Sequence, residues 1–313
     1  MASQILTRLL LSVPVLLGVL ALGFALLQLV PGDPAVVIAG PMATQEVIDE
    51  IRAEMGLDQP VVVQFALYLG RVLQGDLGRS MINNMPVLDE LLRAGGPTLE
   101  LMVASLIWSV PLGIVMGTLA AVYRGRLIDR AVMAVSMAGV SMPIFFIALI
   151  LMRYLGYEWG WLPFVGRGGP LWTIEGLRHI ALPALSLGLI FIGPVARMTR
   201  TSVLEVLSLD HVRTARSKGL SEARVVRAHA LRNALIPVVT LIGLQAGYLL
   251  GGAVVTETIY SWPGLGRLAV GAILSSDLPM AQGTILLLAL AFIVVNLLVD
   301  IAYALLDPRV GTR

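Results

Sequence analysis

The chain contains no cysteine and few charged side chains. The absence of cysteine among 313 residues excludes a disulfide framework, a thiol nucleophile and a thiolate metal site. Charged residues make up 13% of the chain, whereas a soluble globular domain carries about 25%. Hydrophobic residues make up 57%. This composition indicates a protein that lies largely in lipid.

Several catalytic and ligand-binding motifs are also missing. There is no Gly-x-x-x-x-Gly-Lys-Ser/Thr phosphate loop, so the chain does not itself hydrolyse ATP by that route. There is no His-Glu-x-x-His, and the stretch Gly139–Pro143 lacks the final glycine of a Gly-x-Ser-x-Gly elbow. The histidines, His179, His211 and His229, are too scattered to supply the three or four converging ligands of a usual metal site. We therefore expect no catalytic residue, metal or bound cofactor in this chain.

The charge that is present is unevenly placed. The net charge is only +2, but residues 197–232 hold eight basic and three acidic residues. Residues 31–97 hold nine acidic and four basic residues. This asymmetry fits the two faces of a membrane better than it fits nucleic-acid binding.

Six apolar segments are long enough to cross about 30 Å of hydrocarbon at roughly 1.5 Å of helix per residue. Pro143 interrupts the third, and the fourth should continue to Leu207, because Arg197 and Arg200 lie in hydrocarbon only at high cost. Asn296 and Asp300, one turn apart in the sixth, allow either a buried pair or a solvated cap. We expect spans over Leu9–Val30, Leu99–Val122, Ala131–Met152, Ile180–Met198, Ile236–Val255 and Thr284–Leu306.

A cleaved signal peptide is the alternative for Leu9–Val30. Its apolar region would be about 7–15 residues long and would end at a small-residue cleavage site. Here the uncharged run has 22 residues and leads into Val-Pro-Gly-Asp-Pro. We therefore expect an uncleaved first span.

Residues 31–97 are too polar to cross a membrane and predict a small helical cap. Thr44–Met55 and Val61–Leu73 have the spacing of amphipathic helices, and Pro86 suits the first turn of a third helix, Val87–Arg93. The predicted organisation is an N-terminus and first span (1–30), the cap (31–97), a five-helix core (98–306) and a tail (307–313).

Six spans place both termini on one side of the membrane. The short segments on that side contain twelve Arg and Lys residues, and the opposite short segments contain four. The positive-inside rule then puts both termini and the loop at 209–237 in the cytoplasm and the cap outside.

The most informative stretch is this loop, Leu209–Pro237. It holds six basic residues between Arg213 and Arg232 and one acid, Glu222. Two helix-forming pieces flank Gly219, which can end the first in a left-handed cap, while Ser221 can cap the second. By charge alone, an ordinary basic cytoplasmic loop explains it about equally well.

The residue order favours a more specific interpretation. It resembles the cytoplasmic "EAA loop" by which permeases of ABC importers dock a coupling helix on their ATPases. The family pattern is Glu-Ala-Ala, three residues, Gly, nine residues, Ile, any residue, Leu, Pro. Fitting positions are Ala215, Gly219 and Leu231, whereas Arg213, Thr214, His229 and Arg232 depart from it.

The departures themselves are similar to the peptide-importer branch of the family. The likeness covers nearly the whole chain, and it implies the all-α, six-helix fold of type I ABC importer permeases with an extracytoplasmic cap. Further matching pieces are PGDP (31–34), GLDQP (56–60), GDLG (75–78), GLQ (243–245), TET (256–258) and SWPGLGR (261–267).

The resemblance also implies partners and a location in the bacterial inner membrane. It implies a homologous second permease in a heterodimer, two ABC ATPases that carry ATP and Mg, and an extracytoplasmic substrate-binding protein. Dipeptides or short oligopeptides are the expected cargo, with glutathione or nickel complexes as alternatives. The residues it assigns to ATPase coupling are Val212, Arg213, Thr214, Ala215, Arg216, Lys218, Gly219 and Leu220.

Two further clusters have open interpretations. Gly243, Gly247 and Gly251, together with Gln245, mark one part of the fifth span either as a close helix contact or as a strip along the translocation path. The loop after this span is either an interfacial turn anchored by tryptophan or an outer gate near the binding-protein surface. Its residues are Glu257, Trp262, Pro263, Gly264 and Arg267.

Two functions from other classes compete with a permease. An intramembrane enzyme needs a catalytic constellation, and the sequence offers none. A standalone channel does not need the bent two-helix loop. Co-purification with ATPase subunits distinguishes both from a permease.

Overall fold

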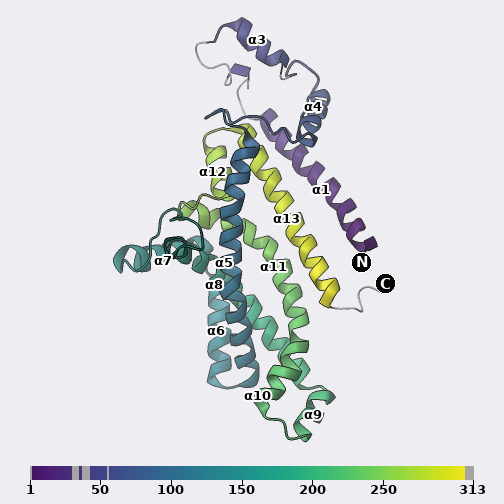
Figure 1. The fold of residues 1–313 in the computed structure, drawn as a ribbon, viewed down its shortest axis with the longest axis vertical. Helices are drawn as coiled ribbons and strands as arrows, with labels where there is room; N and C mark the ends of the chain where they lie inside the picture. The colour runs from purple at the N-terminus through teal and green to yellow at the C-terminus, as the bar shows by residue number, and fades with distance from the viewer. Residues whose placement is uncertain (1, 30–34, 37–42, 55, 307–313) are drawn as a thin grey trace.

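The computed structural model describes residues 2–29, 35–36, 43–54 and 56–306, and every regular element in them is a helix (Figure 1). The all-α fold class is therefore confirmed. The helices are α1 (Ala2–Leu29), α3 (Gln45–Glu54), α4 (Val61–Leu73), α5 (Val87–Val122), α6 (Leu127–Ser141), α7 (Ile144–Leu151), η1 (Met152–Glu158), α8 (Ile174–Leu207), α9 (Asp210–Ser217), α10 (Glu222–Arg224), η2 (Val225–Ala230), α11 (Leu231–Ile259), α12 (Leu265–Leu274) and α13 (Leu278–Leu306).

Four helical stretches are long and apolar enough to cross a membrane: α5, α8, α10 to α11, and α13. A fifth results if α6, α7 and η1 count as one bent span. The apolar part of α1, Leu10–Ala25, is shorter. Each predicted span therefore coincides with apolar helix, and the total of six stays a prediction.

The core of the bundle is the contact of α5 with α8. Two glycines on α5 make it possible, because a Cβ at Gly113 would lie 2.8 Å from Val195 and one at Gly117 would lie 2.3 Å from the Ala196 carbonyl oxygen. These glycines are a small-xxx-small pair, which lets two helix backbones approach closely. The fully buried Leu101 and Val195 belong to the cluster formed there.

The third apolar segment is not one helix interrupted by a proline but two helices that point in different directions. The axes of the two parts differ by 101° across Met142 and Pro143. Met142 is extended, with ψ of 130°, because a proline disfavours the helical conformation of the residue before it. As a result α7 projects sideways from the bundle (Figure 1).

The predicted third cap helix, Val87–Arg93, is not separate. It is the beginning of α5, so residue 97, the predicted end of the cap, lies inside a continuous helix. Pro97 removes one helical N–H donor, yet the helix continues, as it does in other membrane helices where neighbours satisfy the freed carbonyl groups. Separately, the Trp262 indole N–H donates to the carbonyl oxygen of Pro97 itself at 2.9 Å, which links the segment before α12 to α5.

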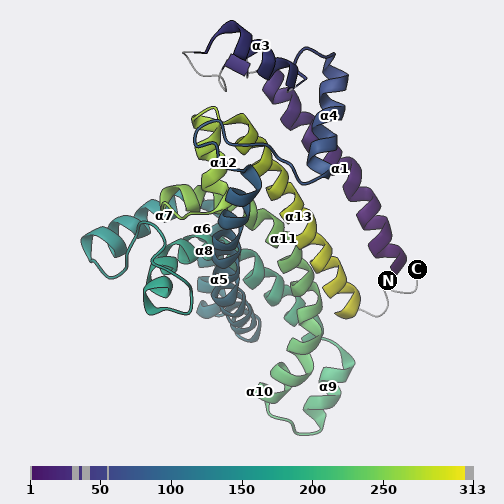
Figure 2. The same cartoon turned by 45° about the horizontal axis from the view of Figure 1, so that its top comes forward.

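The two other cap helices are present as predicted, except that Met55 lies outside the described residues. Both views place α4 alongside α1 (Figures 1 and 2). The ring of Phe24 on α1 meets Phe65 at a centroid distance of 5.4 Å and Tyr68 at 6.0 Å. Aromatic packing therefore ties α4 to the end of the first apolar helix.

Candidate functional site

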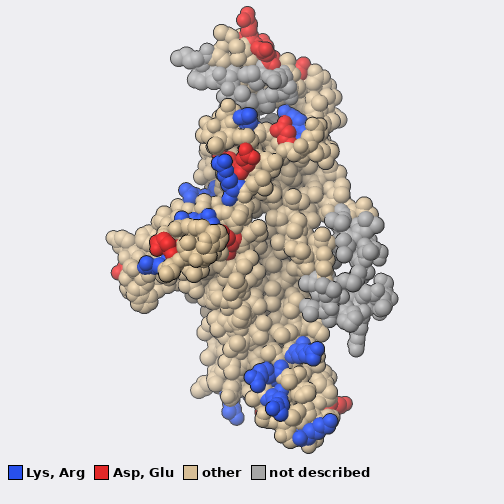
Figure 3. All heavy atoms as spheres, in the orientation of Figure 1, with Lys and Arg blue, Asp and Glu red and all other residues tan. Residues whose placement is uncertain are grey.

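The α9–η2 loop, residues 208–230, forms one end of the molecule, opposite α3 (Figure 1). Arginine and lysine side chains gather over this end, whereas acidic side chains are more frequent at the other (Figure 3). The charge asymmetry in the sequence thus becomes an asymmetry between two ends of the fold.

The first helix of the loop, α9, ends as predicted. Gly219 has φ of +77°, in the left-handed region. Its N–H donates to the Arg216 carbonyl at 2.9 Å, and the Leu220 N–H donates to the Ala215 carbonyl at 3.5 Å. This pair of bonds is the Schellman motif, in which a left-handed glycine satisfies the last carbonyl groups of a helix. The predicted left-handed cap is confirmed.

The underside of the loop is a small apolar core. Val212 and Val225 are fully buried and Ala215 nearly so. They pack against Leu220 and against Val206 in the last turn of α8. Apolar contact therefore fixes α9 on the end of α8, because the residues spaced at three and four positions share one helix face.

The start of the second helix is held differently from the prediction. Ser221 stands at the N-cap position, but its side chain makes no capping hydrogen bond. Instead Glu222 receives two bonds from Arg216, from Nε at 3.1 Å and from Nη2 at 2.6 Å. A bidentate arginine–carboxylate pair fixes geometry as well as attraction, and it raises the pKa of Arg216. This Arg216–Glu222 clamp joins α9 to α10 across the bend.

The outer surface of the loop is exposed. Among the residues that the resemblance assigns to coupling, three face the core of the loop: Val212, Ala215 and the half-buried Leu220. The exposed ones are Arg213, Thr214, Arg216, Lys218 and Gly219.

A buried ion pair between α8 and α6, which the sequence did not predict, supports the base of the loop. The Arg200 guanidinium on α8 donates to both carboxylate oxygens of Asp129 on α6, at 2.6 and 2.8 Å. The Gly125 N–H adds a bond of 2.9 Å to the same carboxylate. Asp129 is only 5% exposed. Because Arg200 lies on the helix that leads into α9, this pair fixes the base of the loop to a second helix.

The glycines of α11 do not share one environment. A Cβ at Gly243 would lie 1.9 Å from Cγ1 of Val299, and one at Gly247 would lie 2.5 Å from the Phe292 ring. At Gly251 nothing lies within 4 Å. Gly243 and Gly247 therefore pack against α13, Gln245 is half-buried, and Gly251 is exposed. Close helix packing is therefore present at the first two glycines, and the strip along the translocation path stays a prediction.

The loop after α11 is not a surface turn anchored by tryptophan. Trp262 and Glu257 are both fully buried. The indole reaches into the bundle, where its N–H donates to the carbonyl oxygen of Pro97 on α5. Of the two interpretations of this loop, the interfacial turn anchored by Trp262 is therefore wrong. The exposed tryptophans are instead Trp159, Trp161 and Trp172.

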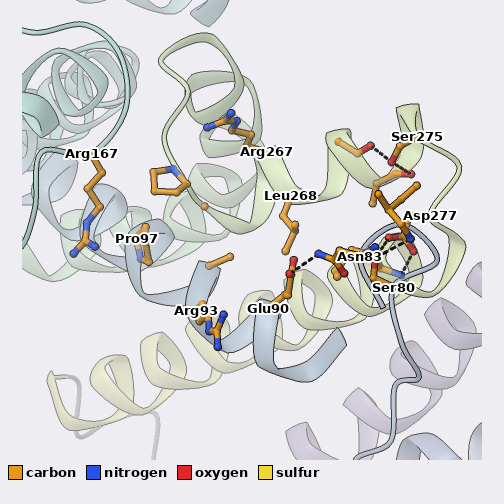
Figure 4. Close-up of a pocket in the computed structure, with 17 residues that line it drawn as sticks. Ser80, Asn83, Glu90, Arg93, Pro97, Arg167, Arg267, Leu268, Ser275 and Asp277 are labelled. Atoms are coloured by element: carbon orange, nitrogen blue, oxygen red, sulfur yellow. Dashed lines mark hydrogen bonds between the residues drawn. The ribbon is translucent and has the colours of Figure 1, made fainter. Parts of the chain in front are cut away.

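Beside this loop lies a pocket of about 700 Å³ (Figure 4). One wall is the beginning of α5 and the other is α12. Pro263, Gly264 and Arg267 line it, as does Pro97 on the opposite wall. Arg267 also donates to the Ser261 carbonyl oxygen at 2.7 Å. Of the predicted outer-gate residues, Pro263, Gly264 and Arg267 therefore line this pocket, and Glu257 and Trp262 do not.

Sequence comparison covers nearly the entire chain. Residues 109–312 match the family described as "Binding-protein-dependent transport system inner membrane component", and residues 1–106 match its N-terminal counterpart. The glutathione transport system permease protein GsiC of Salmonella choleraesuis (strain SC-B67) is 46% identical over 310 residues, 99% of both chains. GsiC of Escherichia coli (strain K12) is 44% identical over the same share.

Solved structures agree on the fold. Two inward-facing crystal forms of the MetNI methionine ABC transporter superpose with TM-scores of 0.56 and 0.58 at 19% identity. They cover 69% and 70% of this chain and 96% of the other. Permeases of this kind lie in the inner membrane and work with ATPase subunits and a binding protein. The chain therefore belongs to the binding-protein-dependent inner-membrane components and is a permease subunit of a peptide-type ABC importer, not itself an enzyme.

Proposed function

We propose that the α9–η2 loop couples this permease to an ABC ATPase. The observation that carries the proposal is the contrast within α9. Its inner face, Val212 and Ala215, is buried on the end of α8, whereas Arg213, Thr214 and Lys218 are exposed. A helix fixed on one face and free on the other can transmit a push from a partner to the helix that carries it.

The connections of the loop support this role. On one side α9 follows α8 after two residues, and on the other α10, η2 and α11 run on continuously. Displacement of α9 would therefore act on two long helices together. ATP and Mg would reside on the two ATPase subunits, and this chain would bind neither.

We further propose that the loop is cytoplasmic, that residues 31–97 with α3 and α4 are extracytoplasmic, and that both termini are cytoplasmic. The charge count of twelve against four supports this orientation. The beginning of α1 and the end of α13 also lie near each other, towards the loop and away from α3 (Figure 1).

The translocation path would form between this permease and a homologous second permease. Gly251 is the candidate for that contact on α11, because it is exposed and has room for a partner's side chain. Equal amounts of two different permease chains in the purified complex would support the heterodimer. A complex with two copies of this chain alone would contradict it.

Dipeptides or short oligopeptides are the proposed cargo, and glutathione, itself a tripeptide, is the alternative favoured by the similarity to the glutathione permeases GsiC. Nickel complexes stay a further alternative. Calorimetric titration of the partner binding protein with a dipeptide series, glutathione and Ni²⁺ tests these in parallel. The ligand that binds most tightly identifies the cargo, and Ni²⁺ binding alone would contradict a peptide importer.

The coupling role is tested in a reconstituted complex of permease, ATPases and binding protein. ATP hydrolysis should rise when loaded binding protein is added, and a variant of α9 that still assembles should lose that rise. Full stimulation with α9 displaced would refute the proposal.

A further inference from the structure

Glu257 is a buried carboxylate whose role neither the fold nor coupling through α9 explains. It is 0% exposed, and within the described residues it forms no ion pair. Taking such a group out of water is costly unless hydrogen bonds compensate. The surroundings of Glu257 should therefore show what the carboxylate is kept for.

Its hydrogen bonds run to the beginning of α12. Oε2 accepts from the Gly266 N–H at 2.7 Å and from the Arg267 N–H at 3.1 Å. The N-cap residue of α12 is Gly264, which has no side chain to do this. Glu257 therefore caps α12 from α11, where the partial positive charge of a helix N-terminus also favours an anion.

Thr98 on α5 completes the arrangement. Its hydroxyl donates to Oε1 of Glu257 at 2.7 Å, and its oxygen accepts from the Leu265 N–H at 2.8 Å. The first three N–H groups of α12 are thus satisfied by two side chains from two other helices. At the residue before Thr98, the bond from Trp262 to Pro97 adds a second link to α5.

Space around the carboxylate is fully used. A Cβ at Gly264 would lie 2.2 Å from Oε1 of Glu257, and one at Gly266 would lie 2.4 Å from the Cα of Val254. The glycines of the sequence Trp-Pro-Gly-Leu-Gly are therefore needed for the close approach of backbone to carboxylate, at φ values that other residues adopt.

Two of the helices joined here, α5 and α12, line the pocket. Pro97, next to Thr98, lines one wall, and Gly264, Arg267 and Leu268 line the other (Figure 4). The bonds between Thr98, Glu257 and α12 connect the two walls at their base. The distance between these two walls therefore sets the width of the pocket.

We propose that Glu257 and Thr98 are positioning residues that hold α12 against α5 and so set the pocket shape that the loaded substrate-binding protein requires. The choice of partner rests on the proposed function, in which the pocket end is extracytoplasmic and α9 faces the ATPases. The pocket is a mixed surface with exposed Arg93 and Arg267 and the apolar Leu268. Such a surface suits a soluble protein partner rather than lipid.

The test uses the complete complex in lipid nanodiscs and three variants. Thr98→Val keeps the side-chain shape but removes the link from α5, leaving the two bonds from Glu257 to α12. Glu257→Ala removes both links. Glu257→Gln is the matched control, because its oxygen can still accept both N–H groups of α12 while its amide donates to Thr98.

The first measurement is the distance between spin labels at Arg93→Cys on α5 and Ser275→Cys after α12, in a chain with no other cysteine. Thr98→Val and Glu257→Ala should broaden or shift the distance distribution, and Glu257→Gln should leave it narrow. If the Glu257→Ala complex does not assemble, the distance distribution of Thr98→Val alone decides the test. A native distribution in Thr98→Val overturns the proposal.

The second measurement is ATP hydrolysis as a function of the concentration of loaded binding protein. Thr98→Val should raise the half-saturating concentration roughly tenfold, the equivalent of one lost interaction, with the maximal rate unchanged. A lower maximal rate at unchanged half-saturation overturns the positioning role. If wild-type hydrolysis is not stimulated at all, the proposed function fails, while the spin-label distances still decide on the link between α5 and α12.

Discussion

The two ends of the molecule use glycine for opposite reasons. At the α9–η2 loop, Gly219 has open space around it and a φ of +77°, so the backbone conformation requires it. At the pocket, Gly264 has an ordinary φ of −104°, but any Cβ would collide with the Glu257 carboxylate. Backbone conformation therefore requires the glycine at the loop, and close packing requires the glycine at the pocket.

The same contrast holds for the bonds. In the loop, the Arg216–Glu222 clamp joins residues six positions apart. At the pocket, Thr98 and Glu257 are 159 positions apart, and the Ser80–Asp277 bond joins residues 197 apart. The bend of the loop is therefore held by bonds between near neighbours in the sequence, whereas the pocket cannot change without separating helices.

The largest expected effect is that of Gly219→Val on uptake. A β-branched residue at this φ costs about 1–2 kcal/mol, too little to unfold the bundle but enough to displace α9. Expression and binding-protein docking should stay normal, while stimulated ATP hydrolysis and uptake are lost. Asn, which tolerates positive φ, is the matched control, and Gly219→Asn should restore most activity. Wild-type uptake by Gly219→Val would show that this end does not couple.

Next in size is the loss of the buried pair that supports the loop. Asp129→Ala leaves Arg200 without its carboxylate and should destabilise the permease by about 3 kcal/mol, the lower end for buried pairs because the Arg200 side chain is 25% exposed. Thermal unfolding of the purified complex measures this. The double variant Asp129→Ala with Arg200→Met should recover part of the loss. Equal stability of wild type and Asp129→Ala would mean that the pair does not support the loop.

The helix spans and the loop were predictable because their signals are local. Apolar run length located the helices, and Gly219 with its flanking helical pieces located the bend. The polar contacts of Glu257 and Asp129 were not predictable, since nothing in the residues near Glu257 points to Thr98. The continuity of α5 through Pro97 was missed because proline usually ends a helix, whereas membrane helices tolerate it inside.

A third prediction compares two glycines of α11, one packed against α13 and one exposed. Gly247→Ala should cost about 1–3 kcal/mol, because its Cβ would overlap the Phe292 ring. Gly251→Ala is the control and should be neutral or slightly stabilising, since alanine is the better helix former. Thermal unfolding again gives the difference. If both changes are neutral, α11 does not pack on α13 as described.

The smallest perturbation is expected from reporter cysteines, which show on which side of the membrane each end of the molecule lies. Cysteine at Asn83, near the pocket, should react with an impermeant maleimide in intact cells. Cysteine at Ser221 should react only after permeabilisation. Both positions are exposed, so burial does not confuse the result. The reverse pattern would overturn the proposed orientation.

The proposed coupling role depends most directly on which end of the permease touches the ATPase. A photo-crosslinking residue at Lys218, exposed at the end of α9, should form a product with an ATPase subunit in the assembled complex. The same residue at Asp49, on α3 at the opposite end, should form none. Crosslinks from Lys218 and none from Asp49 are expected if α9 docks on the ATPase, and ATPase crosslinks from Asp49 but not from Lys218 would contradict the coupling role.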